Sequence, residues 1–229
     1  AMHLARRHEH PDYCGLAPAL TKPVSAVAFD YGCVLSGPQD PAQVARMHAL
    51  VGIGPEEFES RYRADRLAHD RGTITGQRYW TGILRAGHVV PSAGLIAELI
   101  AADTASWMGK DERMVGWARQ LVACGIQVAI LSNMPAEMRA PIAERHAAWL
   151  SGFPLRLFSC DVGYAKPDPE IYKMLLDGVH LSGDRVLFLD DNAANVEGAR
   201  RAGLRAILYT TYEALRLERL EELGLPQAE

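Results

Sequence analysis

The sequence has few cysteines, no paired spacing among them and no excess of basic residues. Its four cysteines (Cys14, Cys33, Cys124 and Cys160) are scattered through 229 residues, which excludes the closely spaced pairs that bind zinc. Cys124 and Cys160 lie beside apolar runs, and we expect both to be buried free thiols, as suits the reducing cytoplasm. The formal net charge of −4 argues against a nucleic-acid partner.

The first residues lack a continuous apolar stretch. Residues 1–21 contain two arginines and three histidines, so we expect neither a signal peptide nor a membrane span, and no membrane partner. We expect a flexible polar leader rather than a metal site at His3, His8 and His10. The sequence carries no signal for an oligomeric state.

Five short apolar runs predict strands that are buried on both sheet faces. They are rich in Val, Ile, Leu or Phe and do not alternate with polar residues, as is typical of parallel sheets covered by helices. Apolar residues at helical spacing separate the later runs. The predicted strands are residues 24–29, 127–131, 155–159, 185–189 and 205–209, and the predicted helices between them are residues 110–124, 169–179 and 192–202. This order predicts an α/β fold with a doubly wound parallel sheet.

The gap after the first strand is too long for a single connection. About 100 residues separate Asp30 from Ser132, whereas one strand–helix unit needs about 30. Gly and Pro divide this gap into four predicted helices, which are residues 41–51, 55–70, 75–86 and 92–108. We therefore predict an all-helical module at residues 38–108, inserted into a core formed by residues 22–37 and 109–229.

Polar side chains follow the predicted strands at four places. Asp30 ends the first run, Ser132-Asn133 ends the second, and Lys166-Pro167 and Asp190-Asp191 follow further along the chain. Any one of them alone is more often a turn or a helix cap. Together, at the carboxyl ends of parallel strands, they supply a nucleophile, a hydroxyl and an amide for a phosphate, a cation and a carboxylate pair for a metal.

These four segments resemble a known family. Residues 29–35 (FDYGCVL), 130–133 (ILSN), 163–169 (GYAKPDP) and 188–192 (FLDDN) are similar to the four motifs of the haloacid dehalogenase-like hydrolase superfamily, in order. The resemblance covers about residues 23–212. Residues 159–203 especially resemble the phosphatase-type N-terminal domain of soluble epoxide hydrolases and its bacterial single-domain relatives. It implies a Rossmann-like core with a helical cap over the active site.

The resemblance also implies the roles of the motif residues. Asp30 is the expected nucleophile, which forms an aspartyl-phosphate with a small phosphorylated substrate. Ser132, Asn133 and Lys166 are expected to hold the phosphoryl oxygens, and Lys166 to offset transition-state charge. Mg²⁺ suits an oxygen-only site, and Asp30, the Gly32 carbonyl and Asp191 are its expected ligands, with Asp190 in support.

One position departs from the family pattern. Phosphatases of this superfamily usually carry a second Asp two residues after the nucleophile, which protonates the leaving group; here this position is Gly32. General acid–base help contributes about 10²- to 10⁴-fold in rate, so we expect slow turnover or a need for an activated leaving group. Gly32 could instead reflect a positive φ angle.

Three functions stay open on the sequence alone. They are a Mg²⁺-dependent phosphatase, a haloacid dehalogenase that displaces halide with the same Asp30, and a catalytically weak regulatory or binding protein. Cys33 is either reactive or, as we favour, a packing residue. One group of inserted residues faces either the substrate or, as we favour, solvent: Tyr62, Arg63, Arg66, Asp70, Arg71, Tyr79 and Trp80.

Overall fold

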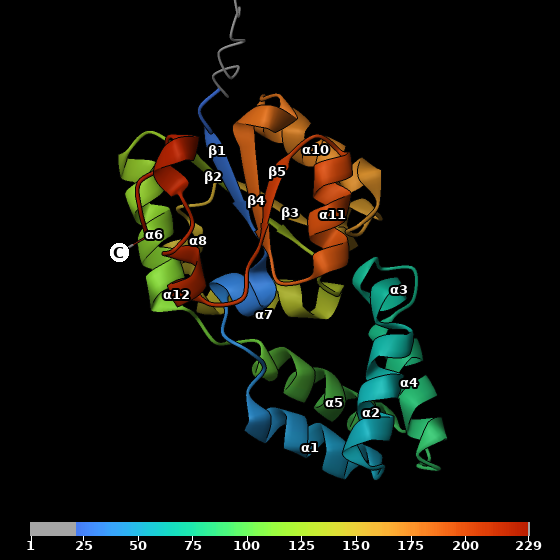
Figure 1. The fold of residues 1–229 in the computed structure, drawn as a ribbon. Helices are drawn as coiled ribbons and strands as arrows, with labels where there is room; N and C mark the ends of the chain where they lie inside the picture. The colour runs from blue at the N-terminus through green and yellow to red at the C-terminus, as the bar shows by residue number, and fades with distance from the viewer. Residues whose placement is uncertain (1–21, 229) are drawn as a thin grey trace, which may run out of the picture.

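The computed structural model describes residues 22–228, in which five strands form one sheet (Figure 1). The expected leader over residues 1–21 and its histidines lie outside the described residues. The strands are β1 (Ala26–Phe29), β2 (Gln127–Ser132), β3 (Leu155–Phe158), β4 (Val186–Asp190) and β5 (Arg205–Leu208). All neighbours pair in parallel, in the order β3-β2-β1-β4-β5. The predicted α/β fold is confirmed.

Different helices cover the two faces of the sheet. Val27 and Phe29 of β1 pack into an apolar cluster with α6 (Glu112–Ala123) and α7 (Ala136–Arg145). Ala26 and Ala28 point the other way and pack with α10 (Pro169–Val179) and α11 (Ala193–Arg201). Figure 1 shows α6 and α12 (Tyr212–Leu215) on one side of the strands and α10 and α11 on the other. Burial on both faces is the reason that the strand sequences do not alternate.

The strand register brings two of the expected acidic residues together. Phe29 pairs with Leu189 of β4 and with Ile130 of β2, so the next residues, Asp30 and Asp190, leave the sheet side by side. The chain runs from β1 outward to β3 and then returns to β4 on the other side of β1. The site therefore lies where the strand order reverses, the usual ligand position in such sheets.

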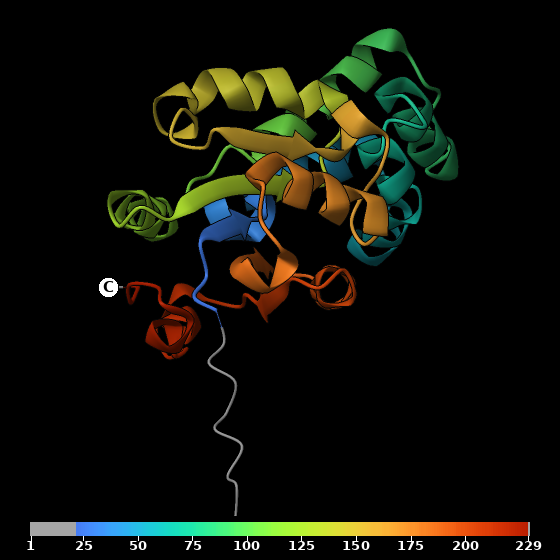
Figure 2. The same cartoon turned by 90° about the horizontal axis from the view of Figure 1, so that it is seen from above.

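The residues between β1 and β2 are helical. They form α1 (Pro41–Val51), α2 (Pro55–Ala64), α3 (Arg66–Asp70), α4 (Gly76–Ala86) and α5 (Ala93–Ser106). These helices build their own apolar cluster around Trp80 and Leu99, whose buried members all fall within residues 47–102. These helices lie beyond the carboxyl ends of the strands (Figures 1 and 2). The boundaries of a separate module at residues 38 and 108 stay a prediction.

Several local predictions were wrong. The helix predicted over residues 55–70 breaks at Asp65, which leaves the helical conformation (φ −110°, ψ 10°). Helix α7 and the short helices α8 (Ala147–Leu150) and α9 (Ser159–Val162) were missed. In α7 only Met138 and Ile142 are buried, so the apolar periodicity is too weak to indicate a helix. Cys124, at the end of α6, is exposed rather than buried, and Cys160 is half-buried. Among residues 22–228, no helix is long and apolar enough to cross a membrane.

Candidate active site

Asp30 lies directly after β1, at the centre of the carboxyl edge of the sheet. Its backbone N–H donates to the Leu189 carbonyl at 2.9 Å, which continues the pairing of β1 with β4. Its Oδ1 accepts from the backbone N–H of Tyr31 at 2.7 Å, and the Ser132 hydroxyl also donates to this carboxylate. Burial raises the pKa of Asp30 to about 7, although the nearby Lys166 ammonium opposes this shift.

Lys166 is a buried cation held between two carboxylates. Its Nζ lies 2.9 Å from Asp30 Oδ1 and 2.6 Å from Asp190 Oδ2, and its side chain is fully buried. Burial alone would lower the pKa of Lys166, but the carboxylates of Asp190 and Asp30 raise it above its usual value. Lys166 therefore stays charged and ties the loop after α9 to Asp30.

Asp190 is saturated with hydrogen bonds. Besides Lys166, its Oδ1 accepts from the backbone N–H of Asn192 at 2.8 Å. The Asn195 side-chain amide donates to both carboxylate oxygens, at 3.0 and 3.1 Å. A carboxylate with all its acceptor positions used in this way is suited to orienting Lys166 rather than to binding a ligand itself.

Asp191 completes a cluster of three acidic side chains. It is exposed, and each of Asp30, Asp190 and Asp191 offers an oxygen atom within 4.8 Å of the others. Partial desolvation by the neighbouring residues and the charge of Asp190 raise the pKa of Asp191. Three carboxylates share one ammonium group, Lys166, so the cluster carries excess negative charge. An oxygen-only donor set of this kind fits a divalent cation such as Mg²⁺.

Gly32 does not need glycine for its backbone conformation. Its φ is −63° and its ψ is 134°, which any residue adopts, so the sequence-based suggestion of a positive φ was wrong. The positive φ lies one residue later, at Cys33 (56°), within the turn Tyr31–Leu35. Burial, followed by the carboxylate of Asp191, raises the pKa of the Cys33 thiol to about 12. A protonated thiol is a poor nucleophile, which agrees with a packing role.

Ser132 and Asn133 join the site at the end of β2. Ser132 is buried beside Asp30. The side chain of Asn133 forms two hydrogen bonds with the backbone of Lys166, accepting from its N–H at 2.8 Å and donating to its carbonyl at 2.9 Å. Sequence reasoning missed this pairing, which commits the Asn133 side chain to holding the Lys166 loop against β2.

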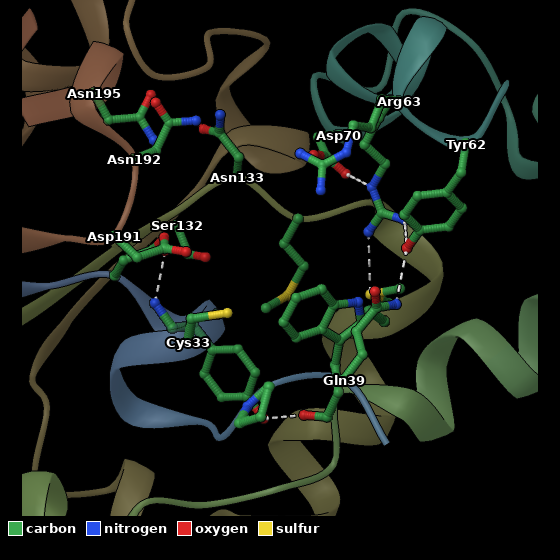
Figure 3. A pocket seen from close by; sticks show the side chains of 18 of the residues that line it. Cys33, Gln39, Tyr62, Arg63, Asp70, Ser132, Asn133, Asp191, Asn192 and Asn195 are labelled. Atoms are coloured by element: carbon green, nitrogen blue, oxygen red, sulfur yellow. Dashed lines mark hydrogen bonds and ion pairs between the residues drawn. The ribbon is translucent and has the colours of Figure 1, made fainter. Parts of the chain in front are cut away.

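A pocket of about 460 Å³ lies between the sheet edge and helices α2, α3 and α7, and Trp107, which follows α5, also lines it. Figure 3 shows Ser132, Asn133 and Asp191 on the sheet side and Tyr62, Arg63 and Asp70 on the helical side. The lining residues comprise the acidic cluster members Asp30 and Asp191, the apolar residues Trp107, Met134, Met138 and Ile142, and the helical residues Glu59, Tyr62, Arg63, Arg66 and Asp70, among others.

The prediction of a solvent-exposed face was wrong for most of these helical residues. Tyr62, Asp70, Tyr79 and Trp80 are buried, whereas Arg63 is exposed as predicted. Arg66 donates to Asp70 at 2.8 Å and to Asp103 at 2.9 Å, and it also contacts the Tyr62 hydroxyl. The Tyr62 hydroxyl in turn donates to Asp103 at 2.6 Å. Sequence reasoning missed Asp103, although a charged residue within the apolar helix α5 is a signal that could have identified it.

Residues of α3 and the loop after it contact the core directly. His69 Nε2 lies 3.2 Å from Glu137 Oε2 on α7, and Glu137 Oε1 accepts from the Gly76 N–H at 2.9 Å. Arg71 forms a two-point ion pair with Asp168, at 2.8 and 3.0 Å. Asp168 lies two residues after Lys166 in the sequence, so this ion pair connects the helical module to the loop that carries the buried cation.

Comparisons with known proteins agree with this geometry. Mouse bifunctional epoxide hydrolase 2 is 36% identical over 109 residues, which are 45% of this chain and 20% of that protein. The chain thus spans about a fifth of the length of that relative. A sesquiterpene phosphatase of Aspergillus oryzae is 29% identical over 167 residues, covering 68% of this chain and 84% of that protein.

Solved structures share the fold. An enzyme of the haloacid dehalogenase family from Bacteroides thetaiotaomicron, in complex with magnesium and inorganic phosphate, has a TM-score of 0.66 at 19% identity; the match covers 82% of this chain and 94% of that one. L-2-haloacid dehalogenase from Xanthobacter autotrophicus has a TM-score of 0.62 at 18% identity, over 88% and 81%. The family model described as haloacid dehalogenase-like hydrolase matches residues 20–203. With four of its motifs converging on one sheet edge, the chain belongs to the haloacid dehalogenase-like hydrolase family.

Proposed function

We propose that this protein hydrolyses small phosphate monoesters through an aspartyl-phosphate on Asp30, with Mg²⁺ as its cofactor. The observation that carries the proposal is the arrangement of a carboxylate nucleophile 2.9 Å from a buried ammonium group, inside a cluster of three carboxylates. A haloacid dehalogenase needs no such acidic cluster, because halide leaves without a metal. The phosphatase named among the relatives supports the same conclusion.

The reaction has two displacements at phosphorus. A carboxylate oxygen of Asp30 attacks the phosphorus atom, and the bond from phosphorus to the substrate oxygen breaks. Water then attacks the phosphorus, and the Asp30 carboxylate leaves as inorganic phosphate is released. Lys166 and the Ser132 hydroxyl stabilise the phosphoryl oxygens, where charge develops in both transition states. Because the side chain of Asn133 is committed to Lys166, we expect Asn133 to contribute only its backbone N–H.

Asp30, the Gly32 carbonyl and Asp191 would hold Mg²⁺. When bound, the ion offsets the negative charge that the carboxylates and the phosphate bring together. Asp190 acts as a positioning residue, since its oxygens are taken by Lys166, Asn192 and Asn195. Helices α1–α5, within residues 38–108, act as the cap that closes the pocket over the substrate.

The test is hydrolysis of 4-nitrophenyl phosphate with Mg²⁺ or with EDTA. We expect turnover by the native protein to require Mg²⁺ and to fall by at least about 1,000-fold in Asp30→Asn, because the amide is not a nucleophile. Asp177→Asn, an exposed carboxylate on α10, is the matched control and should keep full activity. Equal activity of Asp30→Asn and the native protein would refute the proposal. Metal-independent halide release from 2-haloacids would instead assign a dehalogenase.

A further inference from the structure

Trp107 occupies the space beside the position that usually carries the acid. A Cβ atom added to Gly32 would meet three atoms of one residue, the indole Cζ3, Cη2 and Cε3 of Trp107, at 3.4, 3.8 and 3.9 Å. The backbone of Gly32 accepts any residue, as its φ of −63° shows. The turn therefore does not require glycine, and a side chain at this position would lie directly against the indole ring.

The position of Trp107 is fixed from the core. It follows α5, where the chain returns from the helical module, and its backbone carbonyl accepts a hydrogen bond from the Tyr31 hydroxyl at 3.0 Å. Tyr31 is itself buried and adjoins the nucleophile in the sequence. The benzene edge of the indole thus stands next to the turn that carries Asp30, on the wall of the pocket.

Trp107 packs against an apolar cluster. The cluster includes Met134, Met138 and Ile142, which line the same pocket. A leaving-group oxygen that departs on this side meets the ring edge at the place where relatives present a carboxylic acid. Such an oxygen leaves as an anion without receiving a proton. An aromatic ring bonded to the oxygen stabilises this anion by delocalisation, whereas a saturated alcohol does not.

The charged side chains at the helical end of the pocket offer no free cation to a second anionic group on the substrate. Arg66 is neutralised by Asp70 and Asp103, at 2.8 and 2.9 Å. Arg63 pairs with Glu59 one helical turn away. These pairs leave no net positive charge among the pocket-lining side chains of the helical module, so a leaving group with its own carboxylate or phosphate gains no ionic partner there.

On the basis of the proposed phosphatase function, we propose that Trp107 determines specificity and selects phosphate monoesters of uncharged phenols. The leaving ring stacks against the indole, and the phosphate reaches Asp30. The pocket of about 460 Å³ accommodates a phosphate and one or two rings, within the usual size of small-molecule sites. With Gly32 beside Trp107, the protein then needs no general acid, because the substrates that Trp107 selects have stable leaving anions.

The test compares three phosphate esters of similar size in the presence of Mg²⁺: phenyl, benzyl and cyclohexyl phosphate. Phenyl phosphate has an aromatic ring and a stabilised leaving anion, benzyl phosphate has only the ring, and cyclohexyl phosphate has neither. For the native protein we expect kcat/KM for phenyl phosphate to exceed that for cyclohexyl phosphate by at least about 100-fold, the low end of what a general acid contributes. Benzyl phosphate should fall between them because it still stacks.

Two sets of variants assign the effect to Trp107. Trp107→Leu should lower kcat/KM for phenyl and benzyl phosphate by about threefold to tenfold, the range of an aromatic pair, and mainly by raising KM. It should leave kcat/KM for cyclohexyl phosphate within twofold of the native value. Trp107→Phe should retain most of the preference. Gly32→Asp alone should not raise kcat/KM for cyclohexyl phosphate. Gly32→Asp combined with Trp107→Ala should raise it at least tenfold, because the ring no longer crowds the carboxyl group. Melting temperatures of all variants show that each is folded.

The outcomes separate this inference from the proposed function. If no ester is hydrolysed, the phosphatase function fails and this inference falls with it. If all three esters react at similar rates, or if kcat/KM for cyclohexyl phosphate exceeds that for phenyl phosphate, the phosphatase function stands and the aromatic specificity is wrong. A Trp107→Leu variant that loses activity equally on all three esters would likewise overturn the role of the ring.

Discussion

Replacing Lys166 by Met should destabilise the protein strongly and in a pH-dependent way. The Lys166 side chain is fully buried and lies 2.9 and 2.6 Å from the carboxylates of Asp30 and Asp190. Methionine has a similar length and fills the space without the charge. The substitution therefore leaves two neighbouring carboxylates buried with no cation between them.

The size of the effect follows from the loss of a buried ion-pair partner, which costs about 3 to 5 kcal/mol. For a chain of this size each kcal/mol lowers Tm by about 2 to 4 °C, so the expected decrease at pH 8 is about 6 to 20 °C. Burial already raises the pKa of Asp30 to about 7 with Lys166 present, and the loss of Lys166 raises it further. A raised carboxyl pKa means that the folded variant gains stability as pH falls and the group takes up a proton. The difference from the native protein should thus shrink between pH 8 and pH 5.

The assay is urea denaturation of both proteins in EDTA at pH 5, 6.5 and 8. Lys22→Met is the control, because Lys22 forms an exposed ion pair with Asp184 and should change stability by less than about 1 kcal/mol at every pH. A loss below about 1 kcal/mol for Lys166→Met at pH 8, or a loss that does not vary with pH, would show that Lys166 does not neutralise the acidic cluster.

Two further predictions concern the metal site and the contact of His69 with Glu137. Mg²⁺ at about 100 times its Kd should stabilise the protein by about 2.7 kcal/mol. Because protonated Asp30 cannot bind a cation, this stabilisation should be smaller at pH 5 than at pH 8, and it should be largely absent in Asp191→Asn. Thermal melting with Mg²⁺ or EDTA measures it. An equal shift in Tm at both pH values would contradict the metal site. The hydrogen bond from His69 lowers the pKa of Glu137 to about 2, so Glu137 contributes stability above its unfolded pKa that is lost as pH falls towards 2. Glu137→Gln should therefore lower the free energy of unfolding by about 1 to 2 kcal/mol at pH 6, after allowance for partial exposure, and should not change it near pH 2. A loss of stability that is constant with pH in urea denaturation would exclude this interaction.

The strands and the sheet edge could be predicted because they depend on local pattern. The continuous apolar runs predicted all five strands to within two residues at each end, since burial on both faces leaves its mark in composition. Parallel topology placed Asp30, Ser132 and Asp190 at one edge of the sheet, whereas Lys166 lies in the loop after α9 and was assigned to the site by the family resemblance. In the structure Lys166 contacts both acidic residues and Ser132 contacts Asp30, and the roles of these residues stay a prediction.

The contacts between segments that are distant in sequence could not be predicted. The hydrogen bonds of Asn133 with the Lys166 backbone and the ion pair of Arg71 with Asp168 join residues 33 and 97 positions apart. Nothing in either local sequence specifies the partner. The proximity of Trp107 to Gly32 belongs to the same class, because the orientation of a connecting segment depends on how the whole helical module packs.

The contacts of α3 with the core have a consequence for how ligands exchange. The helical module joins the core through two chain connections near Gln39 and Trp107, and through the separate contacts of His69 and Arg71 on another edge. A helical module held to the core at two edges cannot rotate about its chain connections alone. A movement of the helical module that opens the pocket therefore has to break the contacts of His69 and Arg71 as well as bend the two connections.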